Sequence, residues 1–265
     1  MKLLSSAEQA VVNKDFGEIW NTRMARNTIV LVPLVMVLFL PVMYLLMILF
    51  VPAGEMNGVD QMLQLLPREV SYFSVKQGMF YIMTNVVCPM FFLMIPLMVS
   101  SVSAASSFVG EKERGTIQTL LLTPLSVKSI FKAKVLSCAF LSAIATGISF
   151  VVFACVITAG DLFLGMPFFL NWNWLVLVLF LAPGVTVFGV VFMVLVSGRS
   201  KSYMESFQTS GYIVLPLVLL FVGQFTGLFQ LNALILLIIA VVLLVVDCLL
   251  WFVAARSFTP EKLLK

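Results

Sequence analysis

Apolar residues form long runs along this chain, and charged residues are confined to the short stretches between them. Six runs are long enough to cross the ~30 Å hydrocarbon layer of a bilayer, which takes about 20 mostly apolar residues in a helix. Helices are expected because every backbone polar group must be satisfied within the spanning segment. The predicted fold class is therefore an all-α membrane protein. Its single transmembrane domain covers residues 1–265, with spans near 28–51, 81–108, 130–158, 174–196, 212–228 and 231–255.

A different pattern precedes the first span. Phe16, Ile19, Trp20 and Met24 recur at helical spacing, with polar residues between them. This spacing predicts an amphipathic helix over about residues 5–26 that lies in the membrane interface. An ordinary solvated N-terminal helix is the alternative interpretation.

Composition agrees with the hydropathy pattern. Hydrophobic residues make up 62% of the 265 residues and charged residues 11%, against roughly 45–50% and about 25% in a soluble domain. The four cysteines all fall inside predicted spans, which argues against a disulfide framework on an exposed surface. They are Cys88, Cys138, Cys155 and Cys248.

The basic residues are distributed unevenly between the two faces that six spans create. All but Arg68 and Lys76 of the 16 lysines and arginines flank the spans on one face. By the positive-inside rule this face, which carries both chain termini, is expected to be cytoplasmic.

Two features are expected to shape the fourth span. The stretch "NWNW", from Asn171 to Trp174, contains indole rings that favour the level of the lipid headgroups and so predicts the span boundary. Farther along, Pro183 and Gly184 lie in mid-span, where they are expected to kink the helix.

Several classes of membrane enzyme are excluded by what the chain lacks. It contains no histidine, so it has neither the ligands of a zinc protease nor the base of a serine–histidine dyad. An intramembrane aspartyl protease needs two aspartates within the spans, and only Asp247 is available. The chain also lacks the G-x-x-x-x-G-K-[ST] phosphate loop. We therefore predict no catalytic residue, metal site or cofactor in this chain.

A charged stretch between the second and third spans stands out from its apolar surroundings. The charges from Glu111 to Arg114 are followed by Gly115, which permits a helix end. Next comes a segment with a candidate cap, three apolar residues on one helical face and a proline stop. These are Thr116, then Ile117, Leu120 and Leu121, then Pro124. Such a short helix could dock into a groove on a cytosolic partner, whereas the alternative of an ordinary charged loop explains only the charges.

The stretch "EKERGTIQTLLLTPLSVKSIFKAK", Glu111 to Lys134, resembles the signature of the ABC-2 type transporter permeases. The resemblance implies that residues 111–124 form a coupling helix region that contacts a cassette ATPase. It implies a turn, a docking face and a return into the membrane. The turn is formed by Glu111, Glu113, Arg114, Gly115 and Thr116, the docking face by Ile117, Leu120 and Leu121, and the return by Pro124 and Lys134.

The same resemblance implies an assembly in a prokaryotic plasma membrane. Two cassette ATPases carry ATP and Mg²⁺, and they drive a pair of permeases formed by this chain with a second copy or a homologous permease. The lipid bilayer is the remaining expected partner, and nucleic acid is not one. This chain is then the transmembrane subunit of an ATP-binding cassette exporter. An ATPase-independent channel or ion-driven transporter and a membrane immunity or scaffold protein are the alternatives.

Three polar residues within the spans are candidates for a translocation path. Asp247 is the only acid inside a predicted span, so it should face protein or water rather than lipid. It could contact a cation or cargo, or it could pair with a basic residue near the cytoplasmic end of a span. Asn85 and Gln224 could likewise line the path or join helices by hydrogen bonds. The cargo itself stays open between ions, peptides, lipids, glycans and drugs.

Overall fold

The structure is a computed structural model that describes residues 6–52, 72–116, 119, 122–123, 125–198, 200, 202–226 and 231–257. All regular elements in these ranges are helical. Six helices are long and apolar enough to cross a membrane, which confirms the predicted all-α, six-span, multi-pass membrane protein. These six are Arg23–Phe50, Val75–Glu113, Val127–Leu164, Trp172–Ser197, Met204–Phe225 and Ala233–Arg256.

Most of these spans consist of several helical segments in series. The first contains α2 (Arg23–Leu34), η1 (Val35–Phe39) and α3 (Leu40–Phe50). The second contains α5 (Val75–Ile82), η4 (Met83–Val87), α6 (Cys88–Ala104), η5 (Ala105–Val109) and α7 (Gly110–Glu113). The third is α9 (Val127–Leu164), and the fourth contains α10 (Trp172–Val176), η6 (Leu177–Leu181) and α11 (Ala182–Ser197). The fifth contains α12 (Tyr203–Ser210), η7 (Gly211–Val214) and α13 (Leu215–Phe225), and the sixth is α14 (Ala233–Ser257).

Prolines explain three of the π-helical segments. Pro41, Pro89 and Pro183 each stand two residues after a π segment. A proline has no N–H to offer the carbonyl four residues earlier, and its ring crowds that carbonyl. In each case this carbonyl belongs to the middle residue of the preceding π segment, so a local π turn is a natural adjustment. The fourth π segment, η5, has no such proline and leads directly into α7.

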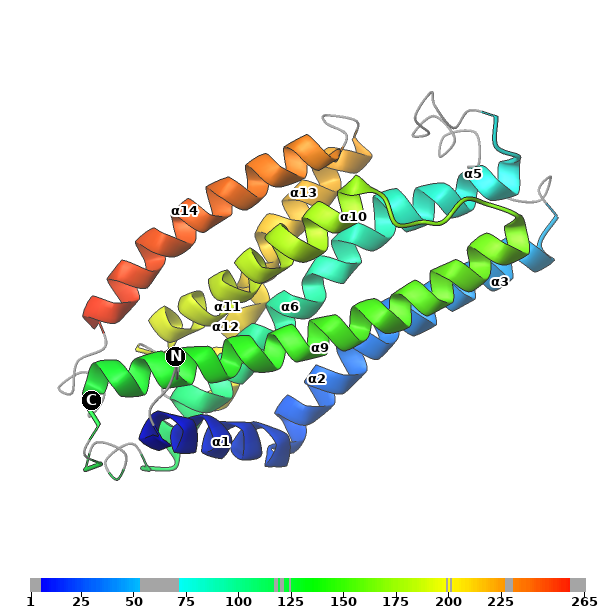
Figure 1. Ribbon diagram of the computed structural model, residues 1–265. Helices are drawn as coiled ribbons and strands as arrows, with labels where there is room; N and C mark the ends of the chain where they lie inside the picture. Colours follow the sequence, from blue (N-terminus) through cyan, green and yellow to red (C-terminus); the bar gives the residue numbers. More distant parts are fainter. Residues whose placement is uncertain are drawn as a thin grey trace.

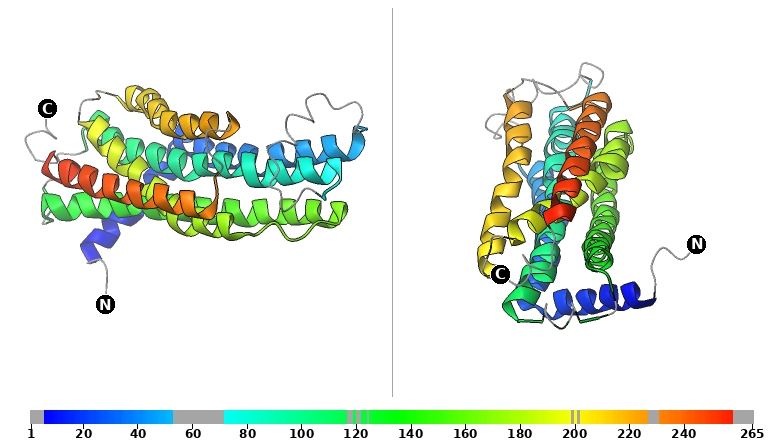
Figure 2. Two further views of the ribbon diagram at one scale, coloured as in Figure 1. Left: turned by 90° about the horizontal axis from the view of Figure 1, so that it is seen from above. Right: turned by 90° about the vertical axis from the view of Figure 1, so that its left-hand side faces the viewer.

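An additional helix, α1 (Ser6–Asn21), lies crosswise over one end of the bundle (Figures 1 and 2). It ends earlier than the expected bound near residue 26, because Thr22 adopts an extended conformation and the next helix begins at Arg23. The last turn of α14 lies at this same end of the bundle. We call this end of the bundle the α1 end.

The second and third spans are much longer than a bilayer requires. At about 1.5 Å per residue, their 39 and 38 residues extend nearly 60 Å, about twice the thickness of the hydrocarbon layer. Both therefore project beyond the membrane. At one end of the bundle α9 packs against α1 (Figure 1), and Glu111 of α7 bonds to Lys14 of α1.

The core of the bundle is built around α6, which packs against α2, α9, α11, α12 and α13. Its closest partner is α11, where Gly189 faces Ser100 and the backbone carbonyl of Leu97. A methyl group on Gly189 would collide with the Ser100 hydroxyl oxygen and lie 3.2 Å from the Leu97 carbonyl oxygen. Gly189 thus allows the close helix approach that small residues permit in membrane proteins.

This packing gives a first prediction, the effect of Gly189→Ala. Overpacking typically costs about 1–3 kcal/mol, so we expect a lower thermal unfolding temperature in detergent. The matched control is Gly147→Ala in α9, where an added methyl meets no atom within 4 Å and alanine favours the helix. Equal unfolding temperatures for the two variants would contradict the packing argument.

An aromatic cluster lies at the start of the fourth span, which begins at Trp172. Trp172 is 75% exposed, but Trp174 is 1% exposed and packs among Phe92, Phe153 and Phe169. Its ring centroid lies 4.7 Å from that of Phe153. Trp174 therefore faces the protein interior, because rings from α6, α9 and the following loop enclose it.

Candidate functional site

The charged stretch after the second span forms a well-defined turn at the α1 end. The helix ends at Glu113, and Gly115 adopts φ +68°, a left-handed conformation that glycine takes without strain. The amide of Gly115 donates to the Lys112 carbonyl at 3.2 Å, and that of Thr116 donates to the Glu111 carbonyl at 3.0 Å. The last carbonyls of the helix are thereby satisfied, as in a glycine-terminated C-cap.

Glu111 points into the bundle rather than toward solvent. Its side chain is 1% exposed, and its Oε2 lies 3.0 Å from Lys134 Nζ, which comes from the first turns of α9 and is 2% exposed. The other carboxylate oxygen, Oε1, accepts a hydrogen bond of 2.6 Å from Lys14 of α1. One buried carboxylate therefore joins three separate segments of the chain.

Lys134 is the centre of this arrangement. Besides Glu111, its ammonium group contacts Asp15 Oδ1 at 3.2 Å and donates to the Ser107 carbonyl at 2.9 Å and hydroxyl at 3.1 Å. The Ser107 hydroxyl donates in turn to Asp15 Oδ2 at 2.8 Å. Lys134 is thus buried inside the protein, because α1 covers it and supplies the carboxylate of Asp15.

A more exposed layer surrounds this centre. Arg114 donates to Glu18 of α1 across 3.0 Å, with 42% of the arginine side chain exposed. Lys14 lies 3.6 Å from the same Glu18 on the next helical turn. Three acids and three bases together form what we call the charge cluster. Its members are Lys14, Asp15, Glu18, Glu111, Arg114 and Lys134.

The electrostatics of the α1 residues follow from burial and pairing. Burial raises the pKa of Asp15, and the charge of Lys134 and the hydrogen bond from Ser107 oppose that rise only in part. For Lys14, burial lowers the pKa, but the hydrogen bond and charge of Glu111 outweigh it and the net pKa is raised. Asp15 therefore depends on Lys134 for its charged form, and Lys14 stays charged at neutral pH.

Three carboxylates within the charge cluster lie close enough together to hold a metal ion. Oxygen atoms of Asp15, Glu18 and Glu111 lie within 4.8 Å of one another. Each carboxylate, however, already faces a lysine or arginine, so the charge of the three acids is balanced by three bases. The donor set suits a structural ion-pair network better than a cation site.

The coupling residues suggested by the family resemblance are only partly visible. Glu111, Glu113, Arg114, Gly115 and Thr116 lie in the turn. Ile117, Leu120, Leu121 and Pro124 lie outside the described residues, so their docking role stays a prediction. Leu122 is described and is 86% exposed, which makes it an additional candidate for an apolar contact in this segment.

The three candidates for a translocation path are not brought together. Asn85, Gln224 and Asp247 lie on different spans, and no hydrogen bond joins any two of them in the described part of the chain. Gln224 is 5% exposed on α13. Their shared role in a path therefore stays a prediction.

Asn85 lines a small cavity of about 190 Å³ at the α5 end of the bundle, whose lining combines aromatic and polar side chains. Its side chain donates to the Tyr81 carbonyl at 3.2 Å and accepts from Asn171 at 2.6 Å. Asp161 lines the same cavity, and its carboxylate accepts from the Phe169 amide at 2.9 Å. These bonds fasten the loop before the fourth span to the second and third spans.

Asp247 lies on the face of α14 that packs against α11. It follows Leu243 by one helical turn, and Leu243 contacts Gly184 of α11. Asp247 is 3% exposed, and neither of its carboxylate oxygens has a hydrogen-bond partner within the described residues. Among the described residues, therefore, no basic residue pairs with Asp247 as the sequence had suggested.

An unpartnered buried carboxylate predicts a stabilising substitution. Leaving a buried polar group unsatisfied costs about 1–3 kcal/mol, so Asp247→Leu should raise the thermal unfolding temperature. The control is Asp247→Asn, which keeps the shape and still leaves two buried polar atoms without a partner, so it should raise the unfolding temperature less than Asp247→Leu. A lower unfolding temperature for Asp247→Leu would show that the carboxylate has a stabilising partner.

Sequence reasoning missed the residues of α1 that complete the charge cluster. Lys14, Asp15 and Glu18 precede the spans and come together with Glu111 only through contacts nearly 100 positions apart in sequence. The one available signal was Asp15, an acid on the same side of the amphipathic helix as Ile19, which is 0% exposed.

Comparison with known protein families gives a match over most of the chain. Residues 9–237 match the family described as ABC-2 family transporter protein. No curated protein matches the chain. The matched region includes five spans, the first part of α14 and the whole charge cluster.

Proposed function

Since the chain belongs to the ABC-2 family of transporter proteins, we propose that it is the permease subunit of an ATP-binding cassette exporter. In this proposal it forms the translocation path and a separate cassette ATPase supplies the energy. Two ATPase subunits and two permeases make the working unit, the second permease being another copy or a homologue. ATP and Mg²⁺ bind to the ATPases.

The observation that carries this proposal is the way the turn at residues 110–116 is fastened. A displacement of this turn by a partner would reach α1 through Glu111 and Lys14, and α9 through Glu111 and Lys134. Because these contacts are buried or partly buried and hydrogen-bonded, they can transmit force rather than yield to it. The ATPase would push on the turn, and the bundle would respond through two helices.

The proposed orientation puts the α1 end in the cytoplasm. The basic residues near the span ends gather on this face, as the positive-inside rule requires of a cytoplasmic side. An ATPase that uses cytoplasmic ATP would then meet residues 110–124. Both termini would be cytoplasmic in a prokaryotic plasma membrane.

Affinity purification from native membranes in mild detergent tests the proposal. We expect a cassette ATPase to copurify in equal amount with the tagged chain, and the complex to hydrolyse ATP in reconstituted vesicles. Transport that continues without any ATPase in the vesicles would instead support the channel or ion-driven alternative.

A further inference from the structure

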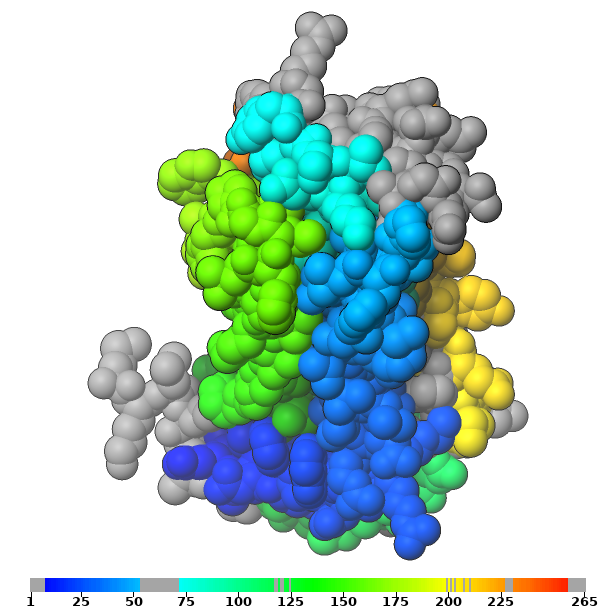
Figure 3. All heavy atoms as spheres, turned by 90° about the vertical axis from the view of Figure 1, so that its right-hand side faces the viewer, coloured from blue at the N-terminus to red at the C-terminus, as the bar shows by residue number. Residues whose placement is uncertain are grey.

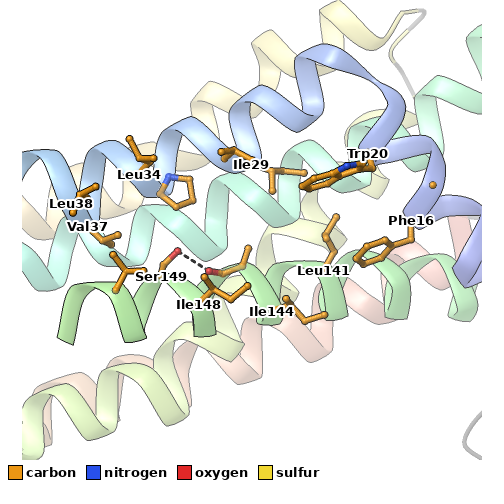
Figure 4. A pocket seen from close by; sticks show the side chains of 15 residues that line it. Phe16, Trp20, Ile29, Leu34, Val37, Leu38, Leu141, Ile144, Ile148 and Ser149 are labelled. Carbon is orange, nitrogen blue, oxygen red and sulfur yellow. Dashed lines mark hydrogen bonds between the residues drawn. The ribbon is translucent and has the colours of Figure 1, made fainter. Parts of the chain in front are cut away.

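A large apolar groove runs along the outside of the bundle between the first and third spans. It has a volume of about 710 Å³ and is walled by α2 and η1 on one side and by α9 on the other. Phe16 and Trp20 of α1 close it at one end (Figure 4). Figure 3 shows the same face, with α1 lying across the foot of α2 and α9.

The groove has a buried inner wall and an exposed rim. Ile29, Val37 and Leu141 are at most 5% exposed and form the interior. Leu34 and Ile148, 46% and 62% exposed, lie at the edges. Small side chains on α9, Ala145 and Ser149, keep the space between the walls open (Figure 4).

The lining determines what kind of ligand can fill the groove. Its volume falls in the ~300–1,000 Å³ range of ligand sites, but such sites usually present several converging polar groups. Here the only side-chain hydroxyl is that of Ser149, and it already donates to the Ala145 carbonyl at 2.6 Å. Apart from the indole N–H of Trp20 at the α1 end, the lining offers no free side-chain donor to orient a peptide, sugar or drug, so the groove suits a plain hydrocarbon chain.

The length of the groove matches one leaflet. Along α2 and η1 the lining extends from Ile29 to Leu38, and along α9 from Leu141 to Val152. At about 1.5 Å per residue these distances are roughly 14 and 17 Å, or about half of the ~30 Å hydrocarbon layer. A hydrocarbon chain that reaches from the headgroups to the bilayer centre would fill it.

Positive charge is available at the α1 end of the groove. Arg26 precedes Ile29 and Val30 by one helical turn, and Arg23 precedes Arg26 by one turn, so both lie in line with the groove on α2. Within the described ranges neither arginine has an acidic partner. Two unpaired guanidinium groups beside the end of a hydrocarbon groove fit a phosphate headgroup.

We propose that this groove binds one anionic phospholipid of the leaflet at the α1 end. Its acyl chain lies between α2 and α9, and its phosphate contacts Arg23 and Arg26. The bound lipid fills the space under α1, the helix that also supplies Asp15 and Lys14 to the charge cluster. This proposal is independent of which ATPase drives the protein.

The test uses the full-length protein in phosphatidylcholine bilayers that contain a trace of phosphatidylglycerol with a photoreactive group in mid-chain. After irradiation, labelled peptides are mapped by mass spectrometry. We expect label to concentrate on residues 29–38 and 141–152, and to fall several-fold when a phosphatidylcholine probe replaces the phosphatidylglycerol probe. Equal label on all lipid-facing helices would mean bulk lipid only and would overturn the proposal.

Three variants and one control separate the contribution of the acyl chain from that of the headgroup. Ile144→Trp fills the groove and should abolish its label, whereas Ile238→Trp, on the lipid-facing side of α14, should leave the label unchanged. Arg23→Ala and Arg26→Ala should each reduce the preference for phosphatidylglycerol about fivefold. The proposal would be contradicted if the groove is still labelled in Ile144→Trp, or if neither alanine substitution changes the preference for phosphatidylglycerol. Crosslinks from the groove to a second copy of the chain would also contradict it.

Discussion

Lys134→Met is expected to be the most damaging single substitution in this protein. It removes the cation that pairs with both Asp15 and Glu111. Buried Asp15 then keeps only the hydrogen bond from Ser107, and Glu111 keeps only Lys14 as a cationic partner. Breaking a buried ion pair in this way costs about 3–5 kcal/mol. We expect a much lower thermal unfolding temperature, and α1 should become accessible to protease because its main polar anchor is lost.

Two comparisons make this result specific. Lys132→Met removes an exposed lysine two residues away on the same helix and should leave the unfolding temperature nearly unchanged. Adding Asp15→Asn and Glu111→Gln to Lys134→Met neutralises the stranded charges, so the triple variant should recover part of the lost stability. If Lys134→Met and Lys132→Met unfold at the same temperature, the charge cluster does not anchor α1.

Arg114→Glu is expected to separate folding from coupling. The pair between Arg114 and Glu18 is substantially exposed, and exposed pairs contribute about 0–1 kcal/mol. The variant should therefore unfold within a few degrees of the parent protein. It should nevertheless lose ATPase copurification or cargo-stimulated ATP hydrolysis, because the turn that meets the partner is repelled by Glu18.

Leu120→Asp provides a second variant on the expected docking face, and Arg256→Glu provides the control. Arg256 lies at the α1 end but on α14, where it stacks on Phe252 at 4.0 Å. Its charge reversal should leave the ATPase bound. Normal copurification together with normal cargo-stimulated hydrolysis in Arg114→Glu and Leu120→Asp would rule out the coupling role.

The spans were predictable because the bilayer imposes a strong rule on sequence. A membrane helix must be apolar over about 20 residues to satisfy its own backbone, and this signal does not depend on tertiary contacts. The helix end at Gly115 was predictable for a similarly local reason. Only glycine adopts a left-handed turn at little cost.

The inward direction of Glu111 could not be predicted in the same way. Helical periodicity assigns residues to faces, but the π segment at Ala105–Val109 shifts the phase of everything that follows it. The partners of Glu111 also come from residues far away in sequence, Lys14 and Lys134. A charged stretch read as a surface feature is therefore half buried, with Glu111 inside and Arg114 outside.

The burial of Trp174 could not be predicted, for a related reason. An indole near a span boundary usually favours the headgroup level, and its neighbour Trp172 is indeed exposed. Trp174 instead enters a cluster with Phe92 and Phe153 from other spans. Which of two adjacent tryptophans faces the core depends on helix packing that the local pattern does not contain.

The central claim is that a cassette ATPase touches the segment after α7, and photocrosslinking tests it most directly. A photoreactive amino acid replaces Leu122, which is 86% exposed, or Phe50, which is 80% exposed at the other end of the first span. In the purified, ATP-hydrolysing complex we predict a crosslink to the ATPase from position 122 and none from position 50. No crosslink from position 122, or equal crosslinks from both positions, would contradict the account.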